Sequence, residues 1–147
     1  MFLRSQGLNL PSLRPDIINQ ANNKRANIYK NKNDANDKNI PVNRDNLSWK
    51  YPGGGLESNS IDLAKFGVKI IDGSFLSPQA RQQLGWGNVF TYSGAQTGAE
   101  SHIRLEFSQG NVIVVLSNQR ISLDEDDPNQ GQEGVGRLAK TISKLIN

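Results

Sequence analysis

The strongest constraint on the fold is an alternating segment that is followed by a short polar connection and an apolar segment. In SHIRLEF, residues 101–107, apolar and polar side chains alternate with the period of a strand that has two different faces. The apolar set is Ile103, Leu105 and Phe107, and the polar set is His102, Arg104 and Glu106. VIVVLSN, residues 112–118, is apolar almost throughout, as expected of a strand covered on both faces. The intervening SQGN has hairpin length, so two antiparallel strands are predicted here.

A third strand and two helices are predicted upstream of this pair. WGNVFTYSG, residues 86–94, is rich in aromatic and β-branched residues and is typical of a strand. A helix is expected to begin after Ser58 or Ser60, to carry Asp62 in its first turn and to end near Gly73. Its apolar stripe is Leu63, Phe66 and Ile70. A short helix is expected after it, with Ser77 as the N-cap and Pro78 in first position.

A last helix is predicted at the C-terminus, roughly over Val135–Ile146. The helical period places Val135, Leu138, Ile142 and Leu145 on the inward face. The order is then loop, helix, short helix, antiparallel meander and helix. This order predicts the α+β class.

The 147 residues divide into an Asn-rich, loop-like connecting region, 1–50, and a more regular domain, 51–147. Residues 1–50 carry nine Lys and Arg against four Asp and Glu, whereas the remainder carries eight against ten. The basic charges are dispersed and lack interleaved aromatic residues, so nucleic acid is not expected as a partner.

Composition limits the chemistry. The chain has no cysteine, and its one histidine, His102, makes a histidine-rich metal site impossible, so neither a metal nor a cofactor is expected. His102 lies on the polar face of its strand, and an exposed strand residue is favoured over a catalytic one. The sequence contains no apolar run of about 20 residues to span a bilayer and no signal-peptide core near Met1. The expectation is either a cytoplasmic protein or a chain without its natural beginning.

The glycine run in PGGGLESN, residues 52–59, resembles a phosphate cradle only superficially. The spacing matches neither G-x-G-x-x-G nor G-x-x-x-x-G-K-[ST], and no Lys-Ser or Lys-Thr pair follows it. Glycines that permit positive φ at the entry to a capped helix are the favoured interpretation.

Several segments, in this order, are similar to serine hydrolases of the β-lactamase-related family. These segments are GGGLESNSIDLAKFGVKIIDGSFLS, GWGN, TYSGAQTGAESHIRLEF and VIVVLSNQ. The family includes class C β-lactamases, D-alanyl-D-alanine carboxypeptidases and related esterases. The resemblance implies the C-terminal portion of a β-lactamase/transpeptidase-like fold and amide or ester hydrolysis through an acyl-serine. Relatives carry a longer segment before GWGN, and the shorter one here is expected to alter the rim of the cleft.

The resemblance also implies a substrate-binding strand at Tyr92-Ser93-Gly94, matching the family's Lys-Thr-Gly or His-x-Gly motif. Tyr92 stands where the family has Lys or His, Ser93 would contact the substrate carboxylate or acyl group, and Gly94 would let substrate approach the strand. The backbone N–H of Ala95 would be the strand-side oxyanion donor. An ordinary strand that ends in a Ser-Gly turn is the alternative.

The family's nucleophile and base are missing from the chain. No lysine has a serine three residues before it, and the nearest mimic is Thr141-x-x-Lys144. Tyr29-Lys30-Asn31 matches Tyr-x-Asn, but its surroundings resemble a later segment of the family. We therefore expect Met1 to lie just downstream of both motifs, and we expect this chain to be inactive alone. The alternative is a non-catalytic binding module that retains part of the fold.

Partners follow from the same reasoning. A peptide-, β-lactam- or ester-like small molecule is expected if an N-terminal half complements the chain. Strands that would come from that half are missing beside the meander, and an unpaired sheet edge recruits other chains. Marginal stability and self-association are therefore expected. The compartment is left open.

Overall fold

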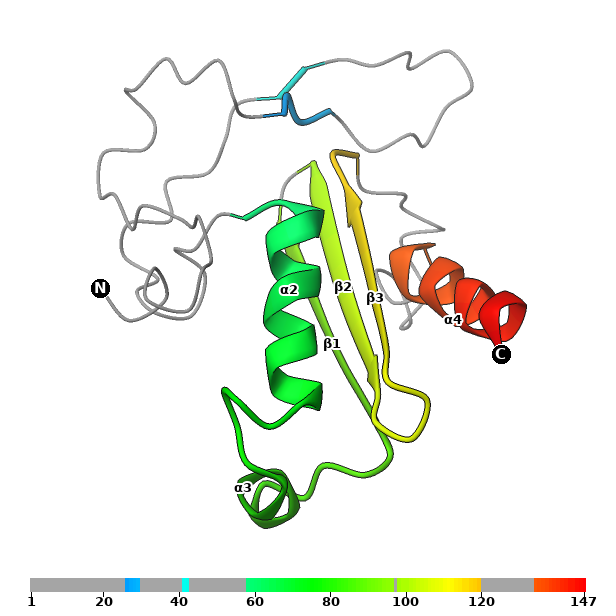
Figure 1. Ribbon diagram of the computed structural model, residues 1–147. Coiled ribbons are helices and arrows are strands. Elements are labelled where there is room, and N and C mark those ends of the chain that lie inside the picture. Colours follow the sequence, from blue (N-terminus) through cyan, green and yellow to red (C-terminus); the bar gives the residue numbers. More distant parts are fainter. Residues whose placement is uncertain (1–25, 30–40, 43–57, 97, 120–133) are drawn as a thin grey trace, which may run out of the picture.

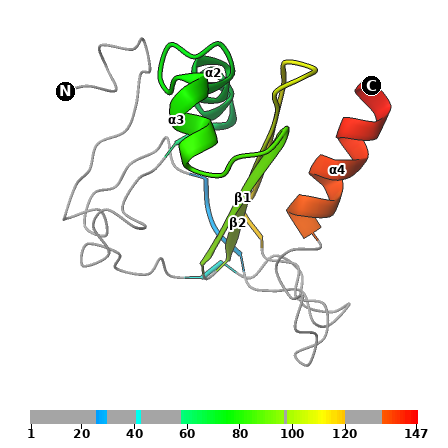
Figure 2. The ribbon, with the colours of Figure 1, turned by 90° about the horizontal axis from the view of Figure 1, so that it is seen from below.

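A computed structural model describes residues 26–29, 41–42, 58–96, 98–119 and 134–147. Over these residues the chain forms a three-stranded antiparallel sheet with helices on both faces (Figures 1 and 2). The elements are α2 (Ser60–Ile71), α3 (Pro78–Gln83), β1 (Val89–Gln96), β2 (Ala99–Glu106), β3 (Asn111–Ser117) and α4 (Gly134–Ile146). The predicted α+β class, meander and C-terminal helix are confirmed. The glycine run at 52–57 lies outside the described residues.

The layers are clearest when the sheet is seen nearly on edge. Figure 2 shows α2 and α3 on one side of the sheet and α4 on the other. Both α2 and α4 pack on β2 and β3, so β3 is covered on both faces, as its apolar sequence predicts. The buried apolar residues include Ile70, Leu105, Ile113, Val135 and Ala139, which come from both interfaces.

Helix α2 begins at a cap that the sequence analysis placed one residue away. The N-cap is Asn59, and neither Ser58 nor Ser60 fills that position. Asn59 accepts a hydrogen bond from the Asp62 N–H at 2.9 Å and donates through its amide to the Asp62 carboxylate at 2.8 Å. A carboxamide can make both bonds at once, whereas a serine hydroxyl is shorter. Gly73, with φ of 82°, ends the helix as predicted.

Helix α2 sits on the sheet through a glycine. Gly67 is buried, and a Cβ built on it would lie 2.6 Å from Val112 Cγ1 and 2.9 Å from Leu105 Cδ2. Real Cβ atoms do not approach other atoms so closely, so the helix backbone itself contacts the side chains of β2 and β3. Leu63 and Phe66, also predicted for this face, are partly buried.

Helix α3 has the predicted cap and holds the end of α2. The Ser77 hydroxyl accepts from the Ala80 N–H at 3.2 Å, with Pro78 in first position. The Arg81 guanidinium donates to the carbonyls of Ile70 and Ile71 at 3.1 and 3.3 Å. These carbonyls belong to the last turn of α2, where helical partners run out. Arg81 also lies 4.4 Å from the centre of the Phe107 ring, so α3 contacts the residue that directly follows β2.

Helix α4 packs through a different face from the predicted one. Its buried residues are Val135, Ala139 and Ser143, whereas Leu138 is 50% exposed and Leu145 is 80% exposed. The prediction for Val135 is confirmed, Ile142 is only partly buried, and the predictions for Leu138 and Leu145 are wrong. The helix packs on the sheet through its small residues, because Ser143 donates a hydrogen bond to the buried carboxylate of Glu106 on β2.

A short part of the first 50 residues lies beside the end of β3. Tyr29 donates its backbone N–H to the Asn118 carbonyl at 3.0 Å and forms bridges with Pro41 and Gln119. The Asn118 side chain donates to the carbonyl of Asn27 at 3.0 Å. Residues 30 and 31, which complete the Tyr-x-Asn match, lie outside the described residues.

Candidate functional site: the outer edge of β1

The predicted binding motif lies on an edge strand. The sheet order within the described part of the chain is β1-β2-β3, so β1 has β2 on one side only. The residues of β1 from Thr91 to Ala95 are all exposed. An edge strand presents backbone N–H and C=O groups to whatever lies beside it. The Tyr92-Ser93-Gly94-Ala95 segment is therefore placed where a ligand can reach its backbone.

The hydrogen-bond pattern shows which backbone groups of β1 point outward. The Phe107 N–H donates to the Asn88 carbonyl at 2.9 Å, so residues 88 and 107 form a bonded pair. Bonded and non-bonded pairs alternate along an antiparallel ladder. In the observed register, Tyr92↔Ile103 and Gly94↔Ser101 are then bonded pairs. The N–H and C=O groups of Thr91, Ser93 and Ala95 consequently point away from β2.

The side chains of the motif are divided between the two faces of the sheet. Tyr92 is 69% exposed and, like Gly94, lies on the α2 face, whereas Ser93 and Ala95 lie on the α4 face. A Cβ on Gly94 would approach Ser101 Oγ to 2.9 Å, which accounts locally for a glycine there. At its outer edge, the strand therefore presents the backbone N–H and C=O groups of Ser93 and Ala95, and the Ser93 hydroxyl lies on the α4 face beside them.

His102 is the partner of Ser93, which the sequence analysis missed. Ser93 Oγ lies 2.7 Å from His102 Nδ1. The two residues are directly opposite in the register and form a non-bonded pair, in which cross-strand side chains come closest. The sequence predicted an exposed side chain for His102, but this residue is partly covered, and Gly136 of α4 lies beside its ring.

The surroundings of His102 favour its neutral form. Burial lowers the pKa of the imidazole below its ordinary value of 6.5, and the positive charge of Arg104 lowers this pKa further. A neutral imidazole has one nitrogen that donates and one that accepts. Near neutral pH, Nδ1 therefore accepts a hydrogen bond from the Ser93 hydroxyl when Nε2 carries the ring hydrogen.

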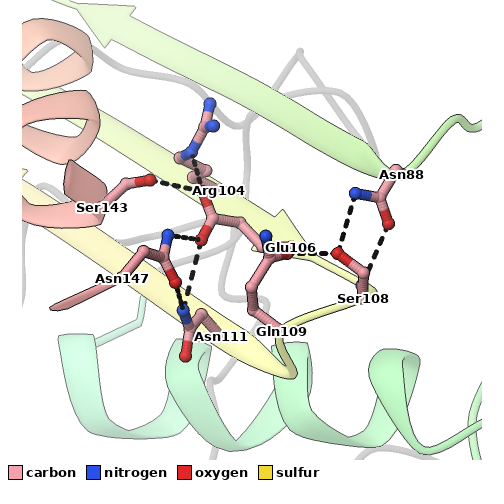
Figure 3. Close-up of polar contacts among 8 residues, drawn as sticks. All are labelled: Asn88, Arg104, Glu106, Ser108, Gln109, Asn111, Ser143 and Asn147. Carbon is pink, nitrogen blue, oxygen red and sulfur yellow. Dashed lines mark hydrogen bonds and ion pairs between the residues drawn. The ribbon is translucent and has the colours of Figure 1, made fainter.

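A buried carboxylate, Glu106, lies on the same face of β2 as His102, four residues along the strand. Glu106 is 2% exposed, and four side chains surround its carboxylate (Figure 3). Oε1 accepts from Ser143 Oγ at 2.5 Å and from Arg104 Nε at 2.7 Å, and Oε2 accepts from Asn147 at 3.1 Å and Asn111 at 3.3 Å. The hydrogen bond from Ser143 lowers the pKa of Glu106, burial raises it, and the bonds from Arg104, Asn147 and Asn111 lower it, to about 2.

This network joins β2, β3 and α4 and also fixes Arg104, the next residue beyond His102 on the same face. Every polar atom of the carboxylate has a donor, which is the condition for burying a charge without a large cost. The alternating pattern placed Glu106 on a polar face, but it gave no sign that a helix covers that face. The polar residues Ser143, in the C-terminal helix, and Asn147, directly after it, are spaced four apart, and this spacing is the signal that could have indicated the covered face.

The described part of the chain has neither a cluster of metal ligands nor a helix that could span a membrane. No group of three or more His, Cys, Asp or Glu side chains there could hold a metal ion. None of the helices α2, α3 and α4 is long and apolar enough to cross a membrane.

Comparison with known proteins adds no relative. No protein-family model, no curated protein and no solved structure matches this chain. The resemblance to the β-lactamase-related family therefore rests on the sequence segments alone, and the family assignment stays a prediction.

Proposed function

We propose that this chain provides one wall of the cleft of a serine hydrolase of the β-lactamase-related family, as the C-terminal part of its transpeptidase-like fold. The observation that carries the proposal is the outward direction of the Ser93 and Ala95 backbone on the exposed edge of β1. An N–H group held on a strand and aimed away from the sheet is suited to an oxyanion or a ligand carbonyl. The order of helix, short helix, meander and helix is consistent with this proposal.

The proposed wall binds a peptide-, ester- or β-lactam-like molecule but does not turn it over alone. A nucleophilic serine needs a neighbouring base, and the chain contains no Ser-x-x-Lys sequence. Oxyanion and binding groups without the nucleophile leave only residual catalysis. Nucleophile and base would have to come from residues beyond the present sequence.

The first experiment measures turnover and covalent labelling of the full chain. It is incubated with a chromogenic cephalosporin, a short-chain p-nitrophenyl ester and a fluorescent penicillin. We expect background hydrolysis and no labelled serine. A covalently labelled serine anywhere in the 147 residues would contradict the proposed division of roles.

The second experiment tests the wall itself by amide NMR with N-acetyl-D-alanyl-D-alanine. We expect saturable shifts at Ser93 and Ala95 with a dissociation constant of about 1–10 mM, since few contacts are available. Ala95→Pro removes the outward N–H and should weaken binding about tenfold, the effect of one lost hydrogen bond.

Thr91→Pro is the matched control. Residue 91 also points its N–H away from β2, so both proline variants leave the β1–β2 ladder intact, as edge strands allow. Peptide binding should be unchanged in Thr91→Pro. If both prolines weaken binding equally, or if neither does, Ala95 is not the donor.

A second candidate, a non-catalytic binding module, is favoured by one observation. Tyr92, in place of the family's cation, projects into solvent on the face away from Ser93, so the motif gathers no charged group. The reading frame upstream distinguishes the two functions. A frame that encodes Ser-x-x-Lys and Tyr-x-Asn supports the hydrolase, whereas unrelated sequence supports the module.

A further inference from the structure

The pair formed by Ser93 and His102 can exist in two hydrogen-bonded forms with opposite directions. When the imidazole is neutral and Nδ1 accepts, the Ser93 O–H points into His102, and only oxygen lone pairs face outward. When the imidazole is protonated, Nδ1 carries hydrogen and donates to Ser93 Oγ. The hydroxyl hydrogen is then free to turn toward a ligand, and a positive charge lies behind it.

These two forms have opposite preferences for a ligand. Lone pairs on Ser93 repel a carboxylate oxygen, whereas an O–H donor next to an imidazolium forms a charge-assisted hydrogen bond with it. Ser93 is exposed and lies on the edge strand between two outward backbone positions, so a ligand carboxylate can reach it.

Few other charged groups face the pair from the described elements. On β2, Glu100 and Arg104 flank His102 on the same face, and Arg104 is paired with Glu106. Val115 lies opposite on β3, and β1 carries no charged residue. On α4, Gly136 lies beside the ring; Arg137 follows it and Lys140 lies one turn further along, and both are exposed. Glu106 keeps its charge between pH 4.5 and pH 8, because its pKa is about 2. Glu100 is the other carboxylate on this face, and a substitution controls for it below.

We infer that His102 is a positioning residue that decides whether the Ser93 hydroxyl accepts or donates toward a bound carboxylate, so that the β1 edge selects carboxylate ligands when the imidazole is protonated. This inference rests on the proposed function, because it assigns a ligand group to the same edge. The proton moves between solvent and His102, and no covalent bond to the ligand forms or breaks.

The test measures peptide binding by the full chain from pH 8 to pH 4.5, with amide NMR as the readout. N-acetyl-D-alanyl-D-alanine should bind about tenfold more tightly at the acid end, the effect of one charge-assisted bond. The neutral peptide amide should show a much smaller change. By linkage, saturating the protein with the free acid must raise the pKa of His102, which the imidazole C–H signals report.

Two variants separate positioning from simple attraction. His102→Gln should abolish the difference between acid and neutral pH, and Ser93→Ala should retain only the part due to the imidazolium charge. A Glu100→Gln background that keeps the full pH dependence shows that Glu100 is not its source. An unchanged pH dependence in His102→Gln would overturn the inference.

The outcomes also distinguish a failure of the role inferred for His102 from a failure of the proposed function. Peptide binding that is equally strong at all pH values overturns the role of His102 and leaves the proposed wall standing. Absence of peptide binding at every pH overturns both. Imidazole nitrogen spectra of the unaltered chain need no variant: a neutral ring with hydrogen on Nδ1 would also overturn the inference.

Discussion

Glu106 shows how one residue can decide the arrangement of three elements. Its carboxylate is an acceptor for donors from β2, β3, α4 and the residue that follows α4 (Figure 3). A buried charge that is fully hydrogen-bonded is tolerated, but the same site with one partner removed leaves the charge unsatisfied. The network therefore specifies where α4 must lie, and the ordinary packing of Val135 and Ala139 follows.

Acid should unfold the protein partly through this residue. The folded-state pKa of Glu106 is about 2, below its ordinary 4.5. Its contribution is therefore fully present above pH 4.5 and is lost as the pH falls toward 2. Glu106→Gln should lower the free energy of unfolding at pH 7 by about 2–3 kcal/mol, since it removes the charge-assisted bonds.

Denaturant unfolding of both proteins at pH 7, 4.5 and 3 checks this prediction. The difference between the two should shrink as the pH falls, because protonated Glu106 resembles Gln. Ser143→Ala should weaken α4 docking in the same direction, whereas Thr141→Ala, exposed on the same helix, should be close to neutral. A constant difference across pH would show that the ionised form is not the source of stability.

Gly67 gives a second prediction for a single residue. Gly67→Ala should gain about 1 kcal/mol from helix propensity but lose more through overpacking against Val112 and Leu105, which typically costs about 1–3 kcal/mol. Gly136→Ala in α4 is the control, because its Cβ would have an ordinary contact of 3.4 Å with His102. We expect a lower melting temperature for Gly67→Ala and an unchanged or higher one for Gly136→Ala.

At the scale of elements, the face that β2 turns toward the core could be predicted, and the buried face of α4 could not. Alternation in SHIRLEF placed Leu105 in the core, where it is fully buried. The helical period of α4 fits two overlapping stripes, one through Leu138 and Leu145 and one through Ala139 and Ser143. The apolar residues favour the first stripe, but the buried Glu106 carboxylate requires Ser143 and therefore the second stripe. A hydrogen bond between residues far apart in sequence cannot be predicted from helical periodicity.

Substitutions on α4 test which stripe is buried. Val135→Ala should cost about 1–2 kcal/mol, because the side chain is 5% exposed and its methyl groups pack on the sheet. Leu145→Ala removes more atoms but should change stability by less than about 0.5 kcal/mol, since the residue is 80% exposed. Thermal unfolding of the two variants gives the comparison. A larger loss of stability in Leu145→Ala than in Val135→Ala would show that the face predicted from the sequence is the buried one.

The sequence could indicate where the candidate binding strand lies, but it could not indicate which side chain is hydrogen-bonded to Ser93. The resemblance implied a motif at Tyr92-Ser93-Gly94, and these residues lie on the outer edge of β1 in the described sheet. Its hydrogen-bonded partner His102 lies nine positions away on the next strand, and the contact depends on register. One position of slip would have sent the two side chains to opposite faces.

At the scale of the whole molecule, the outer edge of β1, which pairs with no other described strand, should govern association. Strand β1 contains no charge and no proline, the two features that most often protect an edge. We expect concentration-dependent self-association through β1, measurable by light scattering after size exclusion. Thr91→Lys places like charges across a paired edge and should shift the population toward monomer.

Gln109→Lys carries the same added charge in the hairpin between β2 and β3 and serves as the control. It should associate as the unaltered chain does. Since peptide and partner strand would use the same edge, saturating N-acetyl-D-alanyl-D-alanine should also favour the monomer. A monomer at all concentrations with a sharp two-state thermal transition would contradict the prediction.

The contact of Tyr29 with Asn118 has a consequence for the order of folding. The meander joins residues close in sequence, whereas Asn27 and Asn118 are separated by 91 positions. Closing a loop of that length costs about 4 kcal/mol of chain entropy. The hydrogen bonds of Tyr29 and Asn27 with Asn118 and the burial of Ile28 help to offset this cost. Helix α2 and the sheet should therefore assemble first, and the segment around Ile28 should dock last and detach first on heating.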